Sequence, residues 1–209
     1  MKKQIFIASS VLLALVLSMP ALAQTSDPQA VLDQADQFLG QPSFQKSFVQ
    51  GTRYTQDFRE CSTYFPCQKD MLTDYTVKAV SIDTQGTSTA VIAGVTTGIA
   101  DSEMRVPEKK WDDWHGNMVR AVIDSISQSG FIATAIDGHL DHQNVEIDGQ
   151  MKSVDVFKVH VIAKNQLGIS LDETMAVSRE LSGYAQLISW TEKQFSGAIY
   201  TRTMTKFSH

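Results

Sequence analysis

The stretch SVDVFKVHVIA, residues 153–163, decides how this chain is expected to fold. Its β-branched residues and its alternation predict a β-strand rather than a helix. A period of two gives the strand two faces, with Val154, Val156, His160 and Ile162 on one and Phe157, Val159, Val161 and Ala163 on the other. Antiparallel sheets usually bury one face and expose the other. The second apolar face must therefore be covered by more protein or by a ligand.

Strand-like runs on both sides of this stretch predict a large antiparallel sheet. A strand is expected from about Val49 onward, followed by runs at 74–82, 88–98, 130–136, 140–147, 173–181, 184–192 and 195–207. Turn signals separate several of them, including Asp83 to Gly86, Asp137-Gly138 and Asp148-Gly149. The late runs alternate apolar with polar residues, so solvent is expected on one of their faces.

Two segments have the spacing of amphipathic helices. The first follows Asp27, a favourable N-cap, and has Pro28 at its first position and Gly40 at its end. The second lies within residues 106–130 and ends at Gly130. A sheet this long usually twists and curls. The expected fold is α+β, a curved antiparallel sheet (half-barrel) of about seven or eight strands covered by two or three helices.

The N-terminus has the pattern of a secretory signal peptide. Lys2 and Lys3 precede a mostly apolar run, and Ala21-Leu22-Ala23 forms a small-residue cleavage site. That run is short for a membrane span, which takes about 20 residues, and no later run is long enough either. We expect cleavage after Ala23, a single domain over residues 24–209, and a periplasmic location.

The charge of the chain argues against some partners. The formal charge is -5, and loss of the two signal lysines makes it -7 (-5 − 2), because residues 1–23 contain no acid. An acidic chain without a basic run is poorly suited to nucleic acid or to an anionic membrane surface. The composition leaves the oligomeric state open.

Both cysteines lie in one short segment, Cys61-Ser-Thr-Tyr-Phe-Pro-Cys67. In an oxidising compartment such a close pair is expected to form a disulfide. A redox or metal role is the alternative, although the spacing is not C-x-x-C and no neighbouring histidine completes a zinc set.

The residues that could carry chemistry are few. The segment IDGHLDHQNVEIDGQ holds His139 and His142 among four acids, so a Zn²⁺ or Ca²⁺ site is conceivable. Solvated turn residues are the other interpretation, and the one we prefer. His160 is expected to be a hydrogen-bonded core histidine. No G-x-S-x-G, H-E-x-x-H or phosphate-binding glycine loop is present. We therefore predict no catalytic residue, metal or cofactor.

The tryptophan-bearing helix is the strongest candidate for binding. Trp111, Trp114, Met118 and Val122 form a wide, adaptable apolar stripe. The stripe fits either a helix packed in the core or a lid over a cavity for an apolar guest. In the second case the predicted ligand-binding residues are Trp111, Trp114, Met118 and Val122 of the helix and Phe157, Val159 and Val161 of the strand.

The order of elements resembles the periplasmic outer-membrane lipoprotein carrier family. The similarity rests on Ser47-Phe48-Val49-Gln50 before the first strand, on Asp148-Gly149-Gln150 leading into Val154 and Phe157, and on the strands in residues 173–190 and 195–208. The Cys61–Cys67 loop is an addition to that pattern. The resemblance implies a half-barrel whose cavity holds a lipid or the acyl chain of a lipidated protein.

Three functions follow as hypotheses. The first is a non-catalytic periplasmic protein that holds a hydrophobic ligand, a lipid or acyl chain, in a half-barrel cavity. The second is a cavity-free module that binds a protein of the cell envelope. The third is a metal-dependent hydrolase that uses His139, His142 and nearby acids.

Overall fold

The computed structural model describes residues 27–40, 43–67, 69–115 and 118–209. The helices of these residues are α1 (Pro28–Leu39), α2 (Phe44–Ser47), α3 (Glu108–His115), α4 (Met118–Gln128) and a short 3₁₀ helix, η1 (Gly183–Gln186). The strands are β1 (Arg53–Ser62), β2 (Lys69–Ile82), β3 (Ser88–Thr96), β4 (Ser102–Pro107), β5 (Phe131–Ile147), β6 (Gln150–Asn165), β7 (Ser170–Val177), β8 (Leu187–Gln194) and β9 (Ala198–Ser208). The predicted signal peptide, residues 1–23, lies outside the described residues. None of the described helices is both long and apolar enough to cross a bilayer.

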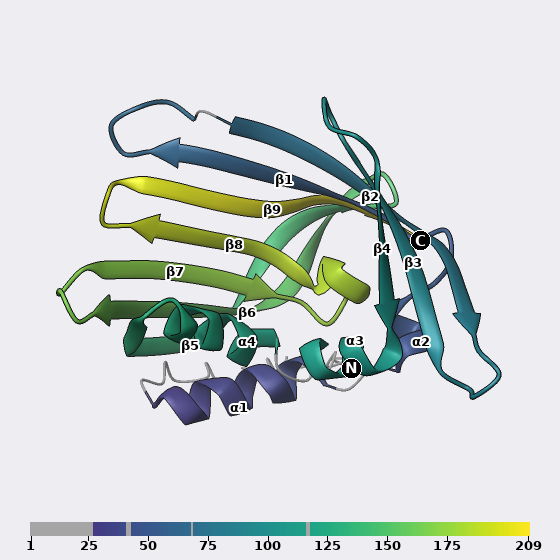
Figure 1. The fold of residues 1–209 in the computed structure, drawn as a ribbon, viewed down its shortest axis with the longest axis horizontal. Coiled ribbons are helices and arrows are strands. Elements are labelled where there is room, and N and C mark those ends of the chain that lie inside the picture. Colours follow the sequence, from purple (N-terminus) through teal and green to yellow (C-terminus); the bar gives the residue numbers. More distant parts are fainter. Residues whose placement is uncertain (1–26, 41–42, 68, 116–117) are drawn as a thin grey trace, which may run out of the picture.

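The nine strands form one curved sheet (Figure 1). Hydrogen-bonded neighbours run β4-β3-β2-β1-β9-β5-β6-β7-β8, and β9 also pairs with β8. Every pairing is antiparallel except that of β5 with β9, which is limited to Glu146 with Lys206 and Ile147 with Phe207. The expected α+β fold with a large, mainly antiparallel sheet is confirmed.

The strand count exceeds the predicted seven or eight. Strand β4 was not expected because SEMRVP has almost no hydrophobic pattern, and only Val106 is buried within it. The segment is a strand because it pairs with β3 from Ser102 opposite Gly94 to Pro107 opposite Thr89.

One local prediction is wrong. Asp137-Gly138 is no turn, because β5 runs through it and pairs with β6 along its whole length. The glycine serves packing instead: a Cβ on Gly138 would lie 2.8 Å from Cγ1 of Val31 in α1 and 2.9 Å from Cζ of Phe157. The helix expected within residues 106–130 is described as α3 and α4, on either side of residues 116 and 117, which lie outside the described part of the chain.

Other local predictions are confirmed. The Asp27 side chain caps α1 by accepting a hydrogen bond from the Gln29 amide at 3.0 Å. Asp148 and Gly149 form the β5–β6 turn, with φ values of 52° and 77°, as a tight hairpin turn requires.

Protein covers both apolar faces of residues 153–163, each along half of the strand. Val154 and Val156 are buried in one core with side chains of β5, η1, β8 and β9. From Phe157 onward the opposite face is buried, under α1 and α4. The covered face therefore changes between Val156 and Phe157, which are both buried.

Candidate functional site

Helices cover one face of the sheet at two separate places. Over β5, β6 and β7, helices α1 and α4 bury a cluster that we call the helix core: Val31, Ala35, Leu39, Val119, Ile126, Ile136, Phe157, Val159, Val161, Ala163, Leu171, Met175 and Val177. Over β2, β3 and β4, helices α2 and α3 bury the Trp111 core: Phe44, Phe48, Val77, Ala90, Ile92, Val106 and Trp111. Figure 1 shows the two helix pairs at different parts of the sheet.

The predicted ligand-binding residues fall into both cores. Trp111 is 0% exposed, and its ring packs at 4.8 Å from Phe48 and 5.5 Å from Tyr184. Phe157, Val159 and Val161 lie in the helix core. The structure therefore does not bring Trp111 together with the three β6 residues. The side chains of Trp114, Met118 and Val122 lie outside the described part of the structure.

A single row of opposed residues connects the two regions across the sheet. Strand register places these neighbours side by side in the order Met71, Phe58, Arg202, Trp190, Met175, Val159 and Gly138. Opposed residues of an antiparallel pair point to the same face. The row therefore runs along the helix-covered face, from Gly138 beneath α1 out to Met71 on β2.

Between the two cores the same face has a hollow of about 500 Å³, which we call the central hollow. Its lining residues are Gln56, Phe58, Met71, Thr73, Tyr75, Glu173, Leu187, Trp190 and Arg202. Leu187 and Trp190 also pack against the helix core, and Tyr75 packs against the Trp111 core. The volume lies within the range usual for small-molecule sites, about 300–1,000 Å³.

Glu173 is the acid of the central hollow. It is only 3% exposed, and its carboxylate accepts a hydrogen bond from the indole N–H of Trp190. The pKa of Glu173 is raised to about 7, chiefly by burial; the charge of Glu192 also raises the pKa, whereas the Trp190 hydrogen bond lowers it. Glu192 lies directly opposite on β8. The carboxyl group is therefore neutral in much of the population at neutral pH.

Arg202 is the cation of the central hollow. Its Nε donates to Oε1 of Gln56 at 2.8 Å, and one of its terminal nitrogens donates to the same oxygen. Gln56 is 3% exposed, so a buried amide holds the guanidinium of Arg202 in place.

A second hollow of about 310 Å³ adjoins the first through Glu173 and Trp190, which line both. Its remaining walls come from α4, the start of β5 and the β7 and β8 strands, with Ile126, Phe131 and Leu171 among them. The Trp190–Glu173 pair thus stands between two adjacent openings on one face.

Sequence reasoning treated β7, β8 and β9 only as late strands with one solvent face. A signal was present in the alternation, because Glu173 has the same parity as Met175 and Val177. An acid in an otherwise apolar row marks a functional or partnered position. Phe58 on β1 and Arg202 on β9 lie in the same row across the sheet, but no feature of the sequence marked them as parts of a site.

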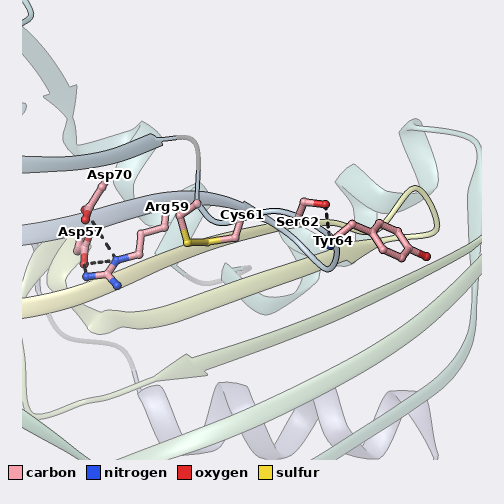
Figure 2. The surroundings of a disulfide bond; sticks show 7 residues. Asp57, Arg59, Cys61, Ser62, Tyr64 and Asp70 are labelled. Atoms are coloured by element: carbon pink, nitrogen blue, oxygen red, sulfur yellow. Dashed lines mark hydrogen bonds and ion pairs between the residues drawn. A yellow bond between two sulfur atoms is a disulfide. The ribbon is translucent and has the colours of Figure 1, made fainter.

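The predicted disulfide is confirmed. Cys61 and Cys67 are joined at the end of β1, as Figure 2 shows, in a loop where Tyr64 and Phe65 are exposed. Next to it, Arg59 pairs with Asp57 at 2.7 Å and lies 3.7 Å from Asp70. None of the cysteines or of these exposed loop residues lines the central hollow.

Two of the three histidines of β5 and β6, His142 and His160, pair with acids, whereas the buried Nδ1 of His139 has no hydrogen-bond partner among the described residues. His160 is half-buried and lies between Asp137 and Asp172, at 3.3 and 3.1 Å. His142 pairs with Asp155 at 2.9 Å. Within the described ranges no group of three potential ligands is arranged to hold a metal ion.

Comparison with known proteins adds no family: no protein-family model matches the chain, and no curated protein matches it.

Proposed function

We propose that this protein is a non-catalytic, exported binding protein that holds a hydrophobic ligand in the central hollow. The occupant is a lipid, an acyl chain or the acyl chain of a lipidated protein. The proposal includes the periplasmic location and the likeness to lipoprotein carriers that the sequence implies. The Cys61–Cys67 disulfide, which forms in oxidising compartments, supports export.

One observation carries the proposal: the helices leave the middle of the face that they share uncovered. The walls of the hollow are the edges of the two cores. Leu187 and Trp190 form the edge of the helix core, and Tyr75 forms the edge of the Trp111 core. Phe58 and Met71 extend the apolar lining onto β1 and β2. Open apolar concavities of this kind are typical ligand sites.

Desolvation of the ligand supplies the binding free energy. Each buried methylene contributes about 0.8 kcal/mol, so about eight methylenes contribute about 6 kcal/mol before the cost of association. No bond of the ligand needs to break, and the ligand is released when the complex meets a better apolar environment.

The test compares two phenylalanines. Phe58→Ala removes a half-buried ring from the hollow, whereas Phe65→Ala removes an exposed ring from the disulfide loop. We expect Phe58→Ala to weaken uptake of the neutral dye N-phenyl-1-naphthylamine about tenfold, and Phe65→Ala to leave it unchanged. Equal uptake by both variants and the wild type would place the dye outside the hollow.

Native mass spectrometry of gently purified protein provides an independent measurement. Extra mass of a lipid supports the proposal. A bare polypeptide mass combined with no dye uptake favours the cavity-free envelope module instead.

A further inference from the structure

We propose, resting on the function above, that the ligand is an aliphatic chain with an anionic oxygen head, and that Arg202 and Gln56 bind this head. The assignment depends on which hydrogen-bonding atoms of these two residues are already used.

The orientation of the Gln56 amide follows from the chemistry of arginine. A guanidinium has donors and no acceptor, so the amide oxygen must be the atom that faces Arg202, as the 2.8 Å contact from Nε shows. The amide nitrogen, Nε2, must then point elsewhere. It is buried and has no hydrogen-bond partner among the described residues.

A buried donor without an acceptor destabilises the protein, because the donor has lost its hydrogen bonds to water and gained none in return. Gln56 lines the central hollow. An acceptor brought into the hollow by a ligand would satisfy Nε2, and an anionic acceptor would do so most strongly.

The charge of Arg202 also favours an anionic head group. The side chain is half-buried, and no carboxylate of the described residues lies within ion-pair distance of it. A partly desolvated cation without a counter-ion is unfavourable. The planar guanidinium fork matches the paired oxygens of a carboxylate or a phosphate.

The acid of the hollow does not fill this role. Glu173 accepts its hydrogen bond from Trp190, and its register position is opposite Glu192 rather than beside Arg202. Its burial keeps much of it protonated at neutral pH, which limits its repulsion of an anionic head.

The chain of the ligand then has an apolar path from the head. Phe58 lies opposite Arg202, and Met71 lies opposite Phe58. Two strand spacings, about 10 Å, therefore separate Arg202 from the far end of this row. An aliphatic chain lying across β1 and β2 contacts both side chains while its head remains at Arg202.

The experiment measures displacement of N-phenyl-1-naphthylamine by three ligands with the same chain: dodecanoate, dodecyl phosphate and 1-dodecanol. In the wild type we expect at least one anionic ligand to displace the dye at a concentration at least tenfold lower than the alcohol. In Arg202→Gln, whose amide still donates to Gln56, this preference should fall below about threefold. Arg105→Gln, an exposed position on β4, makes the same change of charge and should keep the full preference.

The outcomes separate this inference from the proposed function. If the wild type takes up no dye, the binding function itself is wrong. If dye is bound but the alcohol competes as well as both anions, or if Arg202→Gln keeps the preference, the head-group assignment is overturned while the apolar site stands. The ranking of dodecanoate against dodecyl phosphate identifies the kind of head. Unfolding curves of both variants report whether the fold is retained.

Discussion

The indole N–H of Trp190 on β8 donates a hydrogen bond to the buried carboxylate of Glu173 on β7. The two residues lie diagonally across the strand pair, since Met175 is opposite Trp190 and Glu192 is opposite Glu173. This contact holds the ring of Trp190 at the border of the central hollow and the helix core. It also keeps an acid among apolar side chains, with consequences that can be measured.

The stability of the fold should depend on pH through Glu173. The ordinary pKa of 4.5 applies to the unfolded chain, whereas the folded pKa is about 7. Between these values the folded state keeps a proton that the unfolded state has lost, so stability falls as pH rises from about 4.5 to about 7 and then levels off. The full difference is about 3 kcal/mol. Glu173→Gln keeps an acceptor for Trp190 and should lose this dependence.

Urea unfolding of the wild type and Glu173→Gln at pH 5, 7 and 8.5 checks that expectation. The difference in unfolding free energy between them should grow in favour of the glutamine variant as pH increases. Glu103→Gln, exposed on β4, is the matched control and should follow the wild type. A constant difference across the three pH values would contradict the assignment.

Trp111 and Trp190 should separate stability from binding. Trp111→Leu removes volume from a fully buried ring that packs on Phe48 and Tyr184, and should cost about 3 kcal/mol of stability. Dye affinity per folded molecule should remain, because the hollow is lined by other residues. Trp190→Leu should show the reverse pattern, a larger loss of dye affinity than of stability. Loss of dye binding by folded Trp111→Leu would show that the Trp111 core belongs to the site.

Gly138 should tolerate no side chain, because α1 lies against it. The added methyl of Gly138→Ala would meet Val31 at 2.8 Å and Phe157 at 2.9 Å, and overpacking of this kind costs about 1–3 kcal/mol. Val31→Ala removes one of the two obstacles. In a double-mutant cycle the combined variant should therefore be more stable than the sum of the single effects predicts. Additive effects would mean that the strand and helix move apart instead.

The Cys61–Cys67 disulfide should stabilise the fold without affecting the hollow. Closure of such a short loop contributes about 2 kcal/mol. A Cys61→Ser, Cys67→Ser variant should lose about this much in chemical unfolding, and reduction of the wild type should reproduce the loss. Dye affinity should stay at the wild-type value, since neither cysteine lines the hollow. A parallel loss of dye binding would link the loop to the site.

Local chemistry accounts for the features that were predicted from the sequence. The cap at Asp27, the turn at Asp148-Gly149 and the disulfide each depend on residues a few positions apart. The strand at residues 153–163 depends on a pattern inside the strand itself. Where the same local reasoning is wrong, at Asp137-Gly138, a contact with the distant Val31 explains the glycine.

By itself, then, the sequence determined most of the elements, the face that each apolar residue prefers and the covalent loop. Only the tertiary structure decided which strands are neighbours. A period of two assigns Phe58, Trp190 and Arg202 to a face, but the pairing of β1 with β9 and of β9 with β8 places them side by side. The pairing of β1 with β9 joins residues more than a hundred positions apart, such as Phe58 and Arg202, and no pattern within a single strand records it.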